Sequence, residues 1–245
     1  MRCNRRLLLL LLLPLLAAGP RLPADQPKGD QPRYEFRREH DPNGTGKFYM
    51  GREIALVMGH EAAGWLDRPE REKEEQPARL LAILQPKAGE VVADIGAGSG
   101  YYTFRMAKLV APKGKVVAVD IQKEMLDIIR DRMKKENVAN VEPVMGEEAD
   151  PKLKDESVDT ILLVDVYHEF SHPYEMAEAM VKALKVGGRL VFVEYRLEDE
   201  TVPIKLVHKM SEKQVIKEMG PFPLKHVTTH GELPWQHIIV FEKKQ

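Results

Sequence analysis

The chain has 245 residues, of which 43% are hydrophobic and 31% are charged, and its formal net charge is −1. This length and composition are typical of one soluble globular domain with a substantial core. A nearly neutral chain has no excess of basic residues for a phosphate backbone, so we expect no nucleic-acid partner.

The N-terminal segment, residues 1–24, is predicted to be a signal peptide or an N-terminal anchor. Three arginines precede a nearly all-leucine run from Leu7 to Ala18. This order is typical of export signals, and the run is shorter than the roughly 20 apolar residues of a membrane-spanning helix. We therefore expect export to the periplasm or cell envelope, with membrane contact only through this segment. Cys3, the single cysteine, lies within it, so no thiol or thiolate metal site remains after cleavage.

Proline, glycine and charged residues dominate residues 25–47, which predicts a flexible linker before a domain over 48–245. The stretch from Tyr49 to Leu66 is predicted to be helical. The charged run from Arg68 to Glu75 is expected to be a solvated face. A further helix over residues 78–84 is predicted to begin after Pro77.

From residue 89 onward, apolar strands alternate with amphipathic helices. The predicted strands are 91–95, 115–121, 141–145, 158–166, 189–195, 224–229 and 237–241, and the predicted helices are 101–110, 123–135, 174–184 and 211–219. Such alternation predicts a Rossmann-like, doubly wound α/β fold with a mostly parallel seven-stranded sheet. The last two strands are joined by too few residues for a crossover helix, so we expect a C-terminal antiparallel hairpin.

The strongest chemical signal is the glycine-rich loop in VVADIGAGSGYYT, residues 91–103. Asp94 lies near the end of the first core strand, and Gly96, Gly98 and Gly100 let the backbone pass close to a ligand. The N-terminus of the next helix offers unpaired N–H groups to an anionic group. Loops at this edge of an open α/β sheet bind ligands, which predicts a cofactor site.

Asp120 is expected at the end of the second core strand, beside that loop. A carboxylate there can accept hydrogen bonds from both hydroxyls of a ribose, and Ile121 would pack on a purine. A nicotinamide dinucleotide and S-adenosylmethionine both fit this outline. The dinucleotide fingerprint G-x-G-x-x-G requires glycine at position 101, where this chain has Tyr101, so the spacing favours S-adenosylmethionine.

The G-x-G-x-G spacing, with an acidic residue two positions before its first glycine, resembles motif I of the class I S-adenosylmethionine-dependent methyltransferases. The resemblance covers roughly residues 78–243. GEEAD at 146–150 looks like the acidic stretch that meets the adenine amino group, and we assign that contact to Glu148. The residues that the resemblance places at the cofactor are Asp94, Gly96, Ala97, Gly98, Gly100, Asp120, Ile121 and Glu148.

Within this class the chain is most similar to the branch that includes the ubiquinone and menaquinone C-methyltransferases. It also resembles an exported bacterial group of methyltransferase-domain proteins, with which it shares several strings. These are FYMGREIALVMGHEAAGWLDRPERE at 48–72, DVYHEF, VEYR, HKM and LPWQH. The resemblance implies a helical lid over residues 48–75 and a Rossmann-like core over 78–245.

Asp165, His168 and Glu169 are the candidate catalytic residues. In this fold the end of the fourth strand, where Asp165 is expected, faces the methyl group, and His168 and Glu169 follow on the same rim. Methyl transfer requires alignment of the acceptor and exclusion of water, with a base only where the acceptor must lose a proton. Alternatively, His168 and Glu169 cap the next helix and contact only water or backbone.

No Asn-Pro-Pro-Tyr-type sequence follows the fourth strand, which argues against amide and adenine-amino acceptors. We therefore predict methyl transfer to an oxygen or carbon centre of a small molecule. A protein that binds the cofactor without turnover and a nicotinamide-dependent oxidoreductase are the alternatives.

A zinc peptidase is a further alternative, because HEFSH at 168–172 matches the H-E-x-x-H signature. That signature requires both histidines on one helical face, with a third ligand elsewhere. Here the string follows a buried strand, and Pro173 pushes His172 out of the α region. We therefore predict a loop at the strand end and no metal site.

Overall fold

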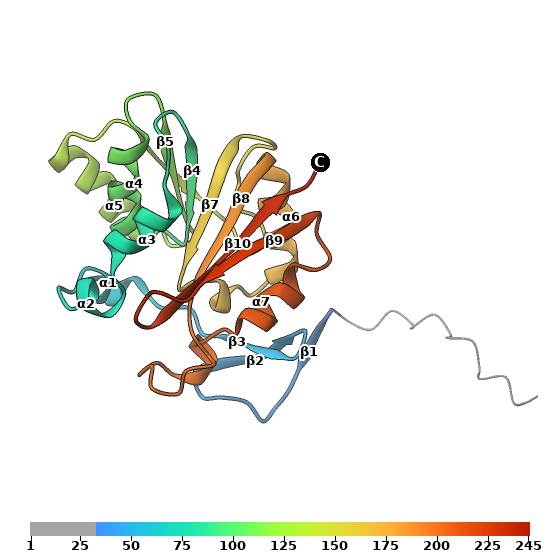
Figure 1. The fold of residues 1–245 in the computed structure, drawn as a ribbon. Coiled ribbons are helices and arrows are strands. Elements are labelled where there is room, and N and C mark those ends of the chain that lie inside the picture. The colour runs from blue at the N-terminus through green and yellow to red at the C-terminus, as the bar shows by residue number, and fades with distance from the viewer. Residues whose placement is uncertain (1–32) are drawn as a thin grey trace, which may run out of the picture. The chain divides into compact units, whose positions relative to one another are not determined.

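A seven-stranded mixed sheet forms the centre of the described part of the chain, which is residues 33–245 of the computed structural model (Figure 1). The strand order is β6-β5-β4-β7-β8-β10-β9, parallel from β6 to β8 and antiparallel at β10 and β9. The strands are β4 (Val91–Ile95), β5 (Lys115–Asp120), β6 (Val141–Met145), β7 (Val158–Val164), β8 (Leu184–Tyr195), β9 (Leu224–His230) and β10 (Gln236–Lys243). The predicted fold class, with its C-terminal antiparallel hairpin, is confirmed.

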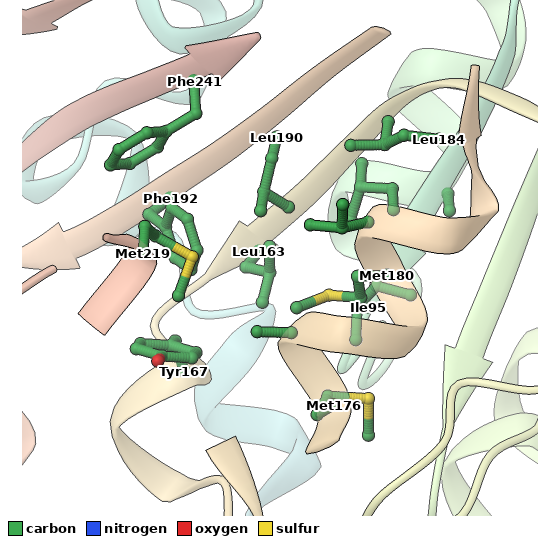
Figure 2. Close-up of a cluster of buried hydrophobic side chains, with 14 of the residues drawn as sticks. Ile95, Leu163, Tyr167, Met176, Met180, Leu184, Leu190, Phe192, Met219 and Phe241 are labelled. Atoms are coloured by element: carbon green, nitrogen blue, oxygen red, sulfur yellow. The ribbon is translucent and has the colours of Figure 1, made fainter. Parts of the chain in front are cut away.

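Helices cover both faces of this sheet because its strands alternate their side chains between two cores. On β8, Leu190 and Phe192 belong to one cluster and Val191 and Val193 to the other. The first cluster packs against α6 (Pro173–Ala183) and α7 (Glu212–Met219), and Figure 2 shows Phe192 beside Tyr167 and Met219. The second packs against α3 (Pro77–Leu84), α4 (Tyr101–Val110) and α5 (Lys123–Glu136).

The α6–β8 connection differs from the prediction. The helix ends at Ala183 and β8 begins at Leu184, so Gly187 and Gly188 lie within the strand, which we had expected to begin only at residue 189. The pairing with β7 shifts register between Val158 and Thr160, which places the glycines in a bulge. Gly187 has a φ of 73°, a conformation that suits glycine at a bulge.

Residues 34–55 form a second, three-stranded antiparallel sheet, where we expected a linker up to residue 47 and then a helix. Its strands are β1 (Tyr34–Phe36), β2 (Gly44–Tyr49) and β3 (Arg52–Ala55). Met50 and Gly51 join β2 to β3, and both have positive φ, as a two-residue hairpin turn requires. The glycines of this region are therefore turn and strand residues, not linker residues.

This small sheet is attached to the large domain by hydrogen bonds and ion pairs from its basic side chains and Tyr34. Arg52 donates from Nε to Glu218 on α7 at 2.7 Å, and Glu218 is fully buried. Lys47 donates to the carbonyl of Ser171 at 2.6 Å, and Arg33 and Tyr34 both bond to Glu175. The sheet lies beneath α7 in Figure 1.

Short helices follow β3 in place of the predicted long one: η1 (His60–Ala62), α1 (Ala63–Leu66) and α2 (Arg71–Glu74). The charged run Arg68–Glu75, which contains α2, is only partly the predicted solvated face: Glu72 and Lys73 are exposed, but Arg71 and Glu75 are 4% and 0% exposed. They form an ion pair at 2.6 Å, and Glu75 also accepts from Arg68 at 2.8 Å.

No helix within residues 33–245 is long and apolar enough to cross a membrane. The segment predicted to be a signal peptide or anchor, residues 1–24, lies outside the described residues.

Candidate functional site

The glycine loop leaves the end of β4 and turns into α4, as the sequence predicted. Gly96 and Gly98 have φ values of 70° and 54°, and both line a cavity. A Cβ added at Gly96 would lie 2.4 Å from Val166, and one at Gly98 would lie 2.5 Å from Leu66. Backbone conformation therefore favours glycine at both positions, and at Gly96 the branched side chain of Val166 also leaves no space for a Cβ.

Asp120 ends β5 beside this loop and faces the same cavity. Its carboxylate accepts hydrogen bonds from the N–H groups of Gly98 and Gln122, each at 2.9 Å. Burial raises the pKa of Asp120, and these two N–H donors oppose the rise. A carboxylate oxygen has a second lone pair, so each oxygen can accept one more bond from a ligand.

Asp94 lies behind the glycine loop rather than in the cavity wall. Its carboxylate accepts a 2.5 Å hydrogen bond from the hydroxyl of Thr103 on α4, and it is 3% exposed. Burial raises the pKa of Asp94 to about 6, with the Thr103 hydroxyl opposing that rise. Asp94 therefore joins β4 to α4 and positions the loop.

Of the other predicted cofactor residues, some line the cavity as Asp120 does, and the others lie behind its wall as Asp94 does. Ile121 and Glu148 line the cavity, with Ile121 38% exposed and Glu148 hydrogen-bonded to the hydroxyl of Ser171 at 2.8 Å. Ala97 and Gly100 are packed in the loop behind the wall, and Gly100 has a φ of 79° where α4 begins. Five of the eight predicted residues thus meet the cavity.

The cavity has a volume of about 530 Å³ and is enclosed by the N-terminal segment as well as by the sheet edge. Val57, Met58, Trp65 and Leu66 line it. The side chain of Gln122 fixes this segment, because its amide donates to the carbonyl of Met58 at 2.9 Å and accepts from the N–H of His60 at 2.8 Å. The predicted lid region therefore covers the cavity, although most of it is not helical.

Arg71 is a cavity residue that the sequence interpretation missed. Its guanidinium pairs with Glu75 and donates to the carbonyl of Leu66 at 2.9 Å. Burial opposes a charge at this position, but Glu75 outweighs burial and raises the pKa of Arg71. The i,i+4 spacing of an Arg–Glu pair is the same whether the pair is buried or exposed. The sequence therefore does not indicate that Arg71, among the charged residues around it, would line the cavity.

His168 lies on η2 (Tyr167–Glu169), lines the same cavity as the glycine loop, and is 2% exposed. Its Nδ1 atom lies 2.6 Å from the carboxylate of Glu194, which also accepts the N–H of Tyr167 at 2.9 Å. Burial disfavours a charged imidazole, but the neighbouring Glu194 carboxylate raises the pKa of His168 overall. The Glu194 contact occupies Nδ1 and leaves Nε2 for other partners.

Glu169 and His208 lie beside His168 and complete a group of three. Glu169 Oε1 lies 3.9 Å from His168 Nε2 and 3.9 Å from His208 Nδ1. His208 comes from η3 (Leu206–His208), after β8. Burial raises the pKa of Glu169 to about 7, and burial together with His168 and Lys205 lowers the pKa of His208 to about 4.

Asp165 lines the cavity but is already engaged in a buried network. Gln236 donates to its Oδ2 at 2.6 Å, and its Oδ1 is buried without a hydrogen-bond partner among residues 33–245. Burial, with Glu75 and Glu194 nearby, raises the pKa of Asp165 well above its ordinary value. The structure therefore places Asp165 in the wall rather than free in the cavity.

The two histidines of HEFSH do not share a site. His172 precedes α6 and contacts Ser171 at 3.0 Å and Glu148 at 3.6 Å, while His168 points toward Glu169 and His208. The structure thus has the loop that we predicted between β7 and α6. The group that it does form was not predicted, because His208 is 40 positions away from His168 in the chain.

A parallel sheet with an antiparallel hairpin, a glycine loop and an acidic strand end facing one cavity define the class I methyltransferase architecture. The model of the methyltransferase-domain family matches residues 86–240, so the chain belongs to this family, whose methyl donor is S-adenosylmethionine. The predicted methyltransferase class and its cofactor, S-adenosylmethionine, are therefore confirmed.

Individual relatives agree with this assignment. The ubiquinone/menaquinone biosynthesis C-methyltransferase of Pseudomonas putida is 34% identical over 110 residues, which are 44% of this chain and 43% of that protein. The chain thus matches less than half of the length of this curated relative. A structure of an S-adenosylmethionine-dependent methyltransferase from Aquifex aeolicus is 25% identical and covers 76% of this chain and 98% of its own, with a TM-score of 0.71.

The fold alone does not determine the reaction. The [4+2]-cyclase SpnF is 12% identical, covers 68% of this chain and 80% of its own, and has a TM-score of 0.57. The chemistry of this chain must therefore be argued from its own cavity.

Proposed function

We propose that this chain transfers a methyl group from S-adenosylmethionine to an oxygen or carbon centre of a small molecule. The observation that supports this most is one cavity whose lining includes both Gly98 and Asp120 and the group His168, Glu169 and His208. We call the first pair the cofactor end and the second group the acceptor end. Its volume of about 530 Å³ falls within the roughly 300–1,000 Å³ of small-molecule sites.

The cofactor end fits S-adenosylmethionine. Asp120 has free lone pairs for two ribose hydroxyls, Ile121 offers an exposed apolar surface for the purine, and Glu148 can accept the adenine amino group. The bound cofactor supplies an electrophilic methyl group. The cover formed by Val57, Met58, Trp65 and Leu66 keeps water away from the cavity and aligns the acceptor.

At the acceptor end, we propose that His168 and Glu169 contact the acceptor. His168 is oriented by Glu194, so Nε2 faces the cavity and can hold a hydroxyl of the acceptor or take up its proton. Asp165 supports this end as a positioning residue, because its carboxylate is bonded to Gln236. The relative from Pseudomonas putida is named for C-methylation of a quinone precursor, which supports a small-molecule acceptor but leaves its identity open.

Calorimetry with S-adenosylmethionine tests the cofactor site. Asp120→Ala should weaken binding at least tenfold, whereas Asp131→Ala, an exposed change on α5, should leave affinity unchanged. Equal affinity of Asp120→Ala and the unchanged chain would contradict the proposal. A screen of hydroxylated and enolic acceptors with a labelled methyl donor then separates an enzyme from a binding protein without turnover, since the latter labels no acceptor.

We further propose that the chain is exported to the cell envelope, either free or anchored. The support is the order of three arginines, a leucine-rich run and small residues within residues 1–24. Cell fractionation of a C-terminally tagged chain tests this proposal. Recovery of the tag in the cytoplasm alone would contradict it.

A further inference from the structure

We propose that His168, Glu169 and His208 bind a divalent transition-metal ion at the acceptor end of the cavity. Within residues 33–245, each of these side chains offers a ligand atom, and the three atoms lie within 4.8 Å of one another. All three side chains line the cavity, so an ion held by them would be reached from it.

The chemistry of this group matches that of known open metal sites. Two imidazoles and one carboxylate are the protein ligands of catalytic zinc sites and of facial triads that keep a coordination position free. Tetrahedral bonds of about 2.0–2.1 Å would place ligand atoms roughly 3.3 Å apart. The two Glu169–histidine distances are 3.9 Å and the whole group lies within 4.8 Å, so the ligands must move closer by between about 0.6 and 1.5 Å to bind an ion.

The surroundings orient the ligands as the second shell of a metal site does. The carboxylate of Glu194 bonds to Nδ1 of His168 at 2.6 Å, which directs Nε2 toward Glu169. Carboxylate–histidine–metal arrangements of this kind are usual around bound ions. The N–H of Met58 donates to Glu169 Oε1 at 3.2 Å and fixes the orientation of that carboxylate.

The local charge also favours a cation. Glu169 and Glu194 bring two carboxylates to the two histidines. Of the basic groups around them, Arg52 is paired with Glu218. Lys205 is bonded only to the neutral amide of Asn43, so its charge opposes a cation here and is outnumbered by the two carboxylates.

A metal ion at this position would select acceptors that present an oxygen, because the ion would coordinate that oxygen and lower the pKa of its hydroxyl. His168 would then act as a ligand instead of the proton acceptor described above, and the coordinated hydroxyl would release its proton to solvent. This consequence rests on the proposed methyl transfer, whereas the metal site itself does not.

The test uses the full chain, stripped of metal with a chelator and titrated with Zn²⁺ by calorimetry. We expect one tight site per chain, and we expect His208→Ala and Glu169→Gln each to weaken it by at least about tenfold. His172→Ala is the matched control, since it removes the second histidine of HEFSH and should leave Zn²⁺ affinity unchanged. Co²⁺ in place of Zn²⁺ should give intense d–d absorption bands that His208→Ala abolishes.

Unchanged Zn²⁺ affinity in both His208→Ala and Glu169→Gln would overturn the proposal, as would loss of the site in His172→Ala. Circular dichroism of each variant separates loss of a ligand from loss of the fold. Calorimetry of the same variants with S-adenosylmethionine should show retained cofactor binding. Failure of the metal site is thereby distinguished from failure of the proposed function.

Discussion

The side-chain amide of Gln236 donates a 2.6 Å hydrogen bond to the carboxylate of Asp165, although β8 lies between the strands that carry these residues. Gln236 is fully buried at the start of β10, and Asp165 follows β7 with a φ of 50°. The bond joins the parallel half of the sheet to its antiparallel edge at the cavity wall.

Gln236→Leu should lower the free energy of unfolding by about 1–3 kcal/mol, because it leaves the Asp165 carboxyl buried without its donor. Urea denaturation measures the change, and Gln245→Leu at the exposed C-terminus is the control. Asp165→Asn should be milder, since burial already favours the uncharged form of this side chain. A larger decrease in the free energy of unfolding for Asp165→Asn than for Gln236→Leu would contradict this prediction.

Arg52→Ala should lower the free energy of unfolding by roughly 3–5 kcal/mol, because Glu218 would remain buried and unpaired. The double variant Arg52→Met with Glu218→Met should recover part of that loss. Arg37→Ala, which breaks an exposed pair with Glu35, is the matched control and should have little effect. Chemical denaturation of the four proteins is the measurement.

The stability difference between Asp94→Asn and the unchanged chain should depend on pH. The pKa of Asp94 rises from its ordinary 3.8 to about 6 on folding, so the unfolded chain ionises first as the pH rises. The folded state therefore loses stability between pH 3.8 and 6, with a full penalty on the order of 3 kcal/mol above that range. Asparagine carries no such charge, so Asp94→Asn should become relatively more stable as the pH rises from 4 to 7. Thermal unfolding of both proteins measures this. If Asp94 does not titrate in that range, the stability difference between the two proteins will not change with pH.

Gly96→Ala and Gly187→Ala form a matched pair, since both glycines have φ values near 70°. At Gly187 an added Cβ meets open space, so alanine should cost only the backbone strain of roughly 1–2 kcal/mol. At Gly96 the Cβ would lie 2.4 Å from Val166, so alanine should displace the cavity wall and weaken S-adenosylmethionine binding as well. Calorimetry of both variants checks this, and equal affinities would contradict it.

The core of the fold could be predicted because its signals are local. The alternation of apolar residues on β8 and the glycine spacing after β4 each require only neighbouring residues to be interpreted. The small N-terminal sheet was misinterpreted because its glycines and prolines are also typical of linkers. The Met50-Gly51 turn between two extended runs was the signal that could have identified it.

The cavity could be predicted only in part, because long-range packing decides which polar groups face it. Asp94 and Asp120 lie at or next to the ends of adjacent strands, but Asp94 bonds to Thr103 behind the loop while Asp120 faces the cavity. The meeting of His168 with His208, and of Asp165 with Gln236, depends on how the segments around β8 and β10 fold back. The spacing of residues along the sequence does not predict these long-range contacts.

The two hydrogen bonds of the Gln122 side chain to Met58 and His60 restrict which side chain can hold the segment that covers the cavity. A primary amide has one donating end and one accepting end, and Gln122 uses both on the backbone of a single covering segment. A carboxylate of the same shape could satisfy the N–H of His60 but would repel the carbonyl of Met58. An uncharged side chain two positions after Asp120, where the cofactor ribose is expected, thus holds the covering segment together with Glu169, which accepts the N–H of Met58. The same segment is therefore fixed from the cofactor side of the cavity and from the His168–Glu169 side.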